Sequence, residues 1–154
     1  MFFITELLDN LTAQAKENPR LRQSYDLRTT PEDGSQRMLN ALEPGTIMPI
    51  HRHRNTSETM VMVRGALVER FYRLNEDDNE NPNLNKGGAE SGDEKLIPVL
   101  TQEFVMRAGG ECPVVQIEAG QWHSLEVLES GTIIFEAKDG KYEPLGEEDV
   151  LERF

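Results

Sequence analysis

The first regular pattern of apolar positions lies at the start of the chain, in FITELLDNLTAQAKENP. Phe3, Leu7, Leu8 and Leu11 recur at helical spacing, and the Asn-Pro pair at residues 18–19 supplies a stop. The pattern predicts one amphipathic α-helix within residues 1–20, as an extension that precedes the main domain.

After residue 20 the helical period gives way to short runs typical of β-strands. They read QRMLNAL, TIMPIH, TMVMV, ALVERFYRL, VLTQEFVMR, VVQIE, HSLEVLE and TIIFEAK, with glycine- and proline-containing breaks between or beside them. Many short strands at regular spacing predict an all-β sandwich or barrel, here a single domain over residues 21–154. The tail GEEDVLERF fits either a short helix or an extra strand.

One segment interrupts this rhythm. Residues 75–95, NEDDNENPNLNKGGAESGDEK, are polar, acidic and rich in Gly and Asn. Such a segment buries too little apolar area to offset the entropy lost on ordering. It is expected to be a long, mobile, protease-sensitive loop inserted between two strands, either a tolerated surface insertion or a functional lid.

Charge and composition narrow the classes of partner. The 154 residues carry a formal charge of -12, which disfavours nucleic acid and anionic membranes as partners. No apolar run approaches the ~20 residues needed to span a bilayer, and the N-terminus lacks the basic region of a signal peptide. The single cysteine cannot form an intrachain disulfide. These features predict a cytoplasmic protein.

The candidate chemistry lies in the three histidines. His51 and His53 stand one residue apart in HRHRNTSE, and in an extended strand both project to the same side. Glu58 opens the next run, and His123 begins another strand after a turn, so two hairpins of a barrel could bring all four together. Two parallel imidazoles make a good half-site for a divalent metal, although a lone histidine is more often a surface or hydrogen-bonded core residue.

The spacing around these residues resembles the first signature motif of the cupin superfamily, position for position. Gly45 is followed by five residues, His51, one residue, His53, four residues, Glu58, six residues and Gly65. Both glycines fit turns that bound a strand pair, where a positive φ is cheap only for glycine.

The second cupin motif is matched less fully, by EAGQWHSLEV. Gly120 and His123 fit, whereas Glu118 stands in place of the usual proline and Val127 in place of the later asparagine. The resemblance covers residues 36–140 and implies a double-stranded β-helix, or jelly-roll barrel, with a metal bound by the three histidines and Glu58.

A closer resemblance is to the WbuC-type cupin metalloproteins. It rests on QRMLNALEPGTIMPIHRHRNTSETMVMVRGALVERFY and AGQWHSLEVLESGTIIFEAKDGKY. This family takes its name from genes of surface-polysaccharide clusters. The resemblance implies a small single-domain cupin with an N-terminal helical extension, and it links the protein to carbohydrate metabolism through that name alone.

Three imidazoles and one carboxylate leave open positions on a metal that takes five or six ligands. Such a centre acts as a Lewis acid or lowers the pKa of bound water. Zn, Fe, Mn, Ni, Co and Cu all suit this donor set, and for zinc Glu58 could lie beside the metal rather than on it. Because ligand imidazoles must be neutral, affinity is expected to fall below pH ~6.5.

Four further residues are candidates for a substrate pocket. Glu136 and Lys138 share one face of the last long strand, which points either into the barrel or to solvent. Arg37 could clamp an anionic group or form a surface salt bridge. Tyr142 fits the barrel mouth or simple packing.

Two functions compete at this point. One is a metal-dependent enzyme acting on a small molecule, and the other is a non-catalytic module in which the metal anchors a ligand or stabilises the barrel. No histidine remains as a free general base if all three bind metal.

Both faces of the strand 58–63 are largely apolar, so its outer face needs cover from the N-terminal helix or from a second subunit, and a homodimer is expected.

Overall fold

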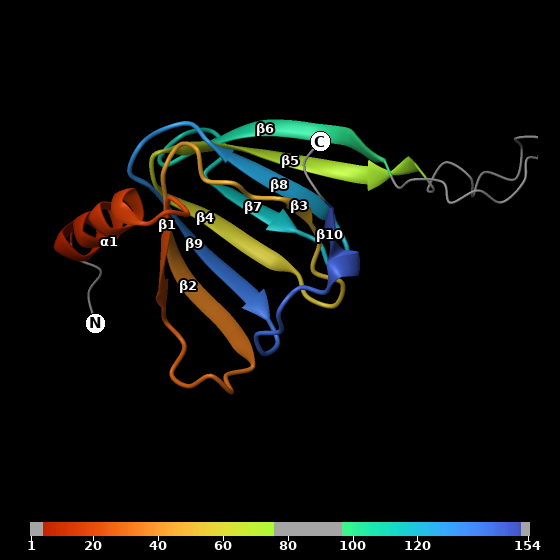
Figure 1. Ribbon diagram of the computed structural model, residues 1–154, viewed down its shortest axis with the longest axis horizontal. Helices are drawn as coiled ribbons and strands as arrows, with labels where there is room; N and C mark the ends of the chain where they lie inside the picture. Colours follow the sequence, from red (N-terminus) through yellow and green to blue (C-terminus); the bar gives the residue numbers. More distant parts are fainter. Residues whose placement is uncertain (1–4, 76–96, 152–154) are drawn as a thin grey trace, which may run out of the picture.

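The computed structural model describes residues 5–75 and 97–151, and its architecture is a jelly roll of two antiparallel sheets (Figure 1). One five-stranded sheet has the order β1 (Arg22–Asp26), β2 (Ser35–Leu42), β9 (Thr132–Asp139), β4 (Glu58–Arg64), β7 (Val114–Ile117). The other has the order β10 (Val150–Leu151), β3 (Ile50–His51), β8 (Trp122–Val127), β5 (Ala66–Leu74), β6 (Pro98–Arg107). The predicted all-β class is confirmed.

The two sheets enclose one apolar core. Met60 and Ile134 of the first sheet are buried against Leu67, Met106 and their neighbours in the second. These residues occupy alternate positions in their strands, as expected for sheets with one face turned to the core.

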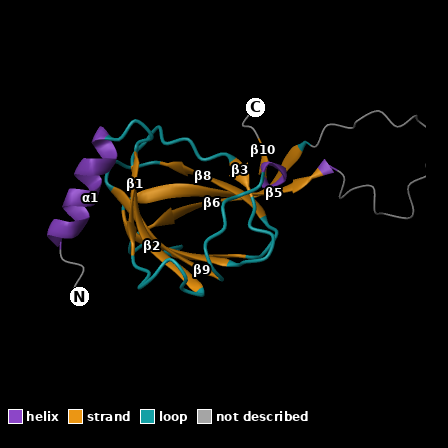
Figure 2. Cartoon of the chain, turned by 60° about the horizontal axis from the view of Figure 1, so that its bottom comes forward, coloured by secondary structure: helices purple, strands orange, loops and turns teal. Residues whose placement is uncertain are grey.

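The predicted N-terminal helix is α1 (Thr5–Glu17), which both views place beside β1 (Figures 1 and 2). Leu8, Leu11 and Ala15 form its buried side, and they pack on outward-facing residues of β2 and β9 such as Leu39 and Ile133. The helix therefore covers part of the outer surface of the first sheet. On β4 the outward-facing Val63 stays 36% exposed, so the expected homodimer remains a prediction.

Most predicted strands are present, with three differences. The run TIMPIH contributes only Ile50–His51, because the chain before it forms a turn and an irregular segment. Strand β1, a polar edge strand, was not predicted. The tail holds both of its predicted alternatives, a 3₁₀ helix at Glu147–Asp149 and then β10.

The acidic insertion lies between β5 and β6, as expected. Residues 76–96 are outside the described part of the chain, so the predicted mobility and sensitivity to proteolysis of this loop stay predictions. Its two ends are joined, because the Asn75 amide donates to the Ile97 carbonyl at 3.1 Å. None of the described helices is long and apolar enough to cross a membrane.

Candidate metal centre

The three histidines converge inside the barrel. His51 of β3 and His123 of β8 are direct partners in the antiparallel ladder, and their ring centroids lie 4.2 Å apart. His53 follows β3 in an irregular segment, where its carbonyl accepts a hydrogen bond from the Gly120 amide at 2.7 Å. One nitrogen from each ring lies within 4.8 Å of the others, so the three could hold one metal ion.

Hydrogen bonds set the orientation of two of these rings. Nδ1 of His51 lies 3.0 Å from the Pro49 carbonyl oxygen, and Nδ1 of His123 lies 3.0 Å from the Gln121 carbonyl oxygen. A carbonyl oxygen only accepts, so each Nδ1 carries the proton and each Nε2 keeps its lone pair. Partners of this kind are typical of metal-binding histidines, because they fix both the tautomer and the ring plane.

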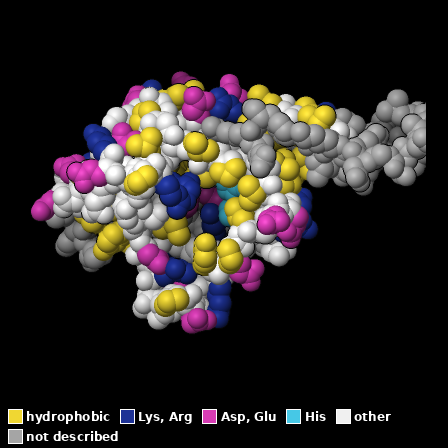
Figure 3. Space-filling model, viewed as in Figure 1, with side chains coloured by type: hydrophobic (Ala, Val, Ile, Leu, Met, Phe, Trp, Pro, Cys, Tyr) yellow, Lys and Arg dark blue, Asp and Glu magenta, His cyan; other side chains and the backbone are white. Residues whose placement is uncertain are grey.

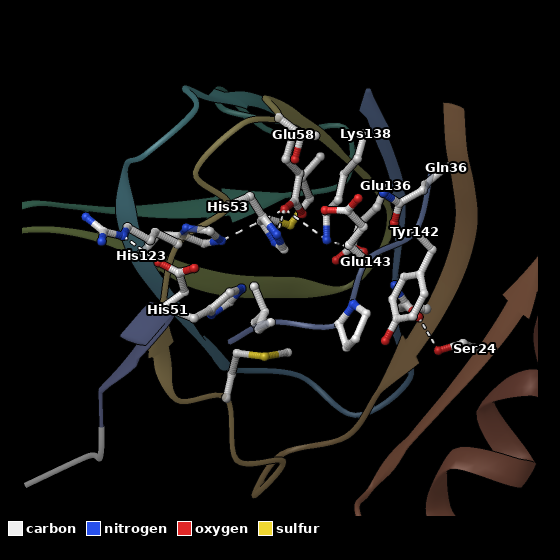
Figure 4. A pocket seen from close by; sticks show the side chains of 18 of the residues that line it. Ser24, Gln36, His51, His53, Glu58, His123, Glu136, Lys138, Tyr142 and Glu143 are labelled. Atoms are coloured by element: carbon white, nitrogen blue, oxygen red, sulfur yellow. Dashed lines mark hydrogen bonds and ion pairs between the residues drawn. The ribbon is translucent and has the colours of Figure 1, made fainter. Parts of the chain in front are cut away.

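Glu58 completes the group from β4 (Figure 4). Its Oε2 lies 3.4 Å from Nε2 of His53 and 3.9 Å from Nε2 of His123, and its side chain is buried. Within the described residues, the His53 Nε2 atom is buried without a hydrogen-bond partner, and the Glu58 Oε2 atom, which also lacks one, has the Lys138 Nζ within ion-pair distance. Buried polar atoms are rarely left unsatisfied, so the unpartnered imidazole nitrogen beside a carboxylate oxygen fits a divalent transition metal.

Burial keeps the three imidazoles neutral. Loss of solvation lowers the pKa of His51 to about 3, of His53 to about 3 and of His123 to about 4. The other rings and the Lys138 ammonium push in the same direction, whereas the carbonyl partners of His51 and His123 oppose the shift. Proton competition for the ligands therefore begins at lower pH than the ~6.5 expected from an unperturbed histidine.

We expect the metal-free protein to lose stability as pH falls from 6.5 towards 4. In the unfolded chain the histidines take up protons near their ordinary pKa of 6.5, but in the folded barrel they do so only near 3 to 4. Each therefore costs up to about 1.4 kcal/mol of folding free energy per pH unit in this window. Urea unfolding at several pH values measures the slope, which should flatten in His53→Gln; an unchanged slope in that variant would contradict the assignment.

Lys138 and Glu136 point into the barrel from β9, which answers the question left open by the sequence. The Lys138 Nζ lies 3.2 Å from Oε2 of Glu58 and 3.8 Å from Oε2 of Glu136. Burial and the charge of Glu58 raise the pKa of Glu136 to about 7, against the opposing effect of Lys138. Burial alone would lower the pKa of Lys138, but Glu136 and Glu58 outweigh it and raise that pKa.

Glu69 is a buried carboxyl that the sequence interpretation missed. It lies on β5 opposite Leu125, is fully buried, and has no hydrogen-bond partner for either oxygen within the described residues. Burial and the charges of Glu58 and Glu136 raise its pKa well above the usual value. Its inward position could have been found from alternation in ALVERFYRL, where residues 67, 69 and 71 share the apolar face.

The remaining candidates differ in position. Tyr142 lines the cavity in front of the histidines and is 58% exposed, as expected of a residue at the barrel mouth. Arg37 is not among the residues that line this cavity; its guanidinium points outward and pairs with Asp33 at 2.8 Å. Asn40, on the other face of β2, lines the cavity instead.

The cavity has a volume of about 790 Å³, within the range of small-molecule sites. Figure 3 shows it as a hollow in which histidine and basic side chains are visible. In Figure 4 the histidines occupy one end, Lys138 and Glu136 the middle, and Ser24 the other end. Part of the rim is the segment 141–149, of which the sequence associated only Tyr142 with the site.

Asp149 binds Arg52 and Arg54 and so holds the His-x-His segment in place; these three residues are called the clasp below. Oδ1 of this buried residue accepts from Nε of Arg52 at 2.8 Å and from Nε of Arg54 at 2.6 Å. The Arg52 amide also donates to the Asp149 carbonyl at 3.1 Å, and its guanidinium stacks on the Trp122 ring at 4.5 Å. The two arginines alternate with His51 and His53 in the sequence, so their pairing with Asp149 holds the segment that carries both imidazoles.

We expect Asp149→Asn to weaken metal binding by about tenfold without unfolding the barrel. Removal of the charge loosens both arginines and therefore the irregular segment that carries His53, and groups that orient metal ligands typically contribute at this level or above. Competition with a chromophoric chelator measures the affinity, with the neighbouring Glu148→Gln as control. Equal affinity in the two variants would show that the clasp does not position the ligand.

Comparison with known structures places this architecture in the cupin fold class. KdgF from Halomonas sp. matches with 13% identity and a TM-score of 0.51, over 81% of this chain and 84% of that one. Oxalate oxidase in complex with the substrate analogue glycolate matches with 17% identity and a TM-score of 0.53, over 81% of this chain and 54% of that one. At such identities the likeness concerns the fold alone.

The sequence also matches the model of a protein family. A family model described as a domain of unknown function, DUF6016, matches residues 3–81, just over half of the chain, and the protein belongs to this family. No curated protein matches the sequence.

Proposed function

We propose that the chain is a metal-binding cupin that binds or transforms a small molecule in the barrel cavity. The metal is a divalent transition ion, held by His51, His53 and His123 with Glu58 as fourth ligand. The observation that carries this proposal is the convergence of three neutral imidazoles from two separate hairpins, two of them with Nε2 lone pairs fixed towards the interior. Residues 21–154 form the cupin domain and residues 1–20 its helical extension.

A bound metal of this kind supplies Lewis acidity or a water of lowered pKa. The chain itself supplies the groups beside it. Lys138 lies between the carboxylates of Glu58 and Glu136 and holds both in place. Glu136, whose pKa of about 7 lets it exist in either protonation state, is the acid–base group that can exchange a proton with a ligand at neutral pH.

The class of small molecule is suggested by the WbuC-type resemblance, which favours a carbohydrate-related metabolite. Hydroxyl and amide groups at the Ser24 end of the cavity support a ligand rich in hydroxyl groups. A cytoplasmic homodimer that binds neither nucleic acid nor membrane completes the proposal.

A non-catalytic ligand-binding or structural cupin module is the second candidate. It is favoured by the use of every histidine of the chain in the cluster, which leaves none as an independent general base. A screen of sugars, keto acids and oxygen consumption with metal-loaded protein distinguishes turnover from binding.

The proposal predicts one metal per chain in freshly purified protein and none in the double variant His51→Ala/His53→Ala. Two of three imidazoles are then missing, and one imidazole with one carboxylate does not retain a transition metal through purification. Elemental analysis measures the content, and Cys112→Ser is the control because it removes the only thiol. Equal metal in wild type and double variant would exclude this centre.

A further inference from the structure

Arg22 is a basic residue on the inner wall of the cavity. It lies on β1 opposite Leu42, and two positions further on the same face Ser24 lies opposite Asn40. All four of these residues line the cavity that contains the histidines. Leu42 belongs to the core between the sheets, so its cross-strand partner Arg22 faces the same inner side of the sheet.

The guanidinium of Arg22 has no strong acceptor. Within the described residues its only hydrogen bond runs from Nη1 to Sδ of Met48 at 3.7 Å, and a thioether sulfur is a weak acceptor. No carboxylate of the described chain lies within ion-pair distance of it. A guanidinium carries five N–H donors, so most of those of Arg22 have no protein partner among the described residues.

An arginine without a carboxylate partner is unusual in a chain with 28 acidic residues. Seven other arginines of the described part form ion pairs with carboxylates: Arg28, Arg37, Arg52, Arg54, Arg64, Arg70 and Arg107. Arg20, which has no such ion pair either, lines the same cavity. Arg20 and Arg22, neither of which forms an ion pair with a described carboxylate, thus both line the cavity.

We infer that Arg22, with Arg20 beside it at the rim, forms an oxyanion subsite that binds a carboxylate or phosphate group of the ligand. The planar fork of a guanidinium matches the two oxygens of either group. Ser24, Gln36 and Asn40 surround this end of the cavity with uncharged hydrogen-bonding groups. The ligand is therefore a small polar molecule with an anionic end; that its other end reaches the histidines rests on the proposed function.

The test uses metal-free protein, so that the probe cannot bind to a metal. Calorimetric titration with inorganic phosphate and, separately, with acetate is expected to show one saturable site for at least one of the two anions. A preference for phosphate assigns a phosphate ester, and a preference for acetate assigns a carboxylate. Absence of saturable binding for both anions overturns the inference.

Arg22→Gln is expected to weaken this binding at least tenfold. Arg64→Gln, which changes an arginine paired with Asp9 outside the cavity, is expected to leave it unchanged. Arg22→Lys keeps the charge but not the fork and should bind with intermediate affinity, which preserves the test if Arg22→Gln fails to fold. Wild-type affinity in a folded Arg22→Gln or in Arg22→Lys overturns the assignment.

The double variant His51→Ala/His53→Ala separates this inference from the metal proposal. It should bind the anion as well as the metal-free wild type does, because the subsite is built from β1 and not from the histidine segment. Anion binding that depends on Arg22 in a protein without metal supports the subsite while the metal proposal fails. Loss of anion binding in this folded double variant overturns the inference.

Discussion

His123→Ala is expected to leave the purified protein without stoichiometric metal, whereas Glu58→Gln retains a measurable part of it. His123 supplies a neutral Nε2 whose direction is fixed by the Gln121 carbonyl, and it is the only ligand from β8. Its loss leaves two imidazoles on one segment. Glu58 shares its Oε2 with Lys138 at 3.2 Å, so part of its charge is already compensated, and three imidazoles remain when it is neutralised.

Elemental analysis and chelator competition measure both variants. Glu118→Gln is the matched control, because it makes the same change in an exposed residue of the His123 hairpin. A full equivalent of metal in His123→Ala would contradict the assigned geometry. Complete loss in Glu58→Gln would contradict the expected ranking and show that the carboxylate is indispensable.

The fold could be predicted where local pattern and tertiary environment agree. The strand ALVERFYRL was bounded correctly as β5 because alternation and the flanking glycine mark its limits. Strand β1 could not be, because its sequence RQSYD is polar and its pairing with β2 depends on packing against α1. The two residues of β10 are paired only because the tail returns to β3, a contact that no local pattern encodes.

The candidate site, like the fold, could be predicted only where a local sequence pattern carries the information. The motif spacing singles out the three histidines, which the fold brings together, and Glu58, which lies beside them; their role as metal ligands stays a prediction. For Glu136 and Lys138 the sequence indicates a shared face but not which side of β9 is inside. Arg22 and Asp149 take their roles from partners distant in sequence, which only the tertiary structure reveals.

Gly65→Ala is expected to be the most destabilising of the small substitutions considered. Gly65 joins β4 to β5 with a φ of +72°, and a Cβ there would lie 2.3 Å from Oγ1 and 2.9 Å from Cα of Thr132. Thr132 is fully buried, and its hydroxyl hydrogen-bonds the amide and carbonyl of Ala66 at 3.2 Å. The backbone atom cannot move aside without disturbing β9, which carries Glu136 and Lys138.

The expected loss combines two terms. A left-handed conformation costs an alanine about 1–2 kcal/mol, and overpacking against a buried backbone adds about 1–3 kcal/mol. Gly109→Ala is the matched control, because its φ is +69° but nothing lies within 4 Å of the added Cβ, so only the first term applies. Urea unfolding of both variants measures the difference. Equal losses would show that the barrel accommodates the methyl group, and that Gly65 is required for its backbone conformation and not for its close approach to Thr132.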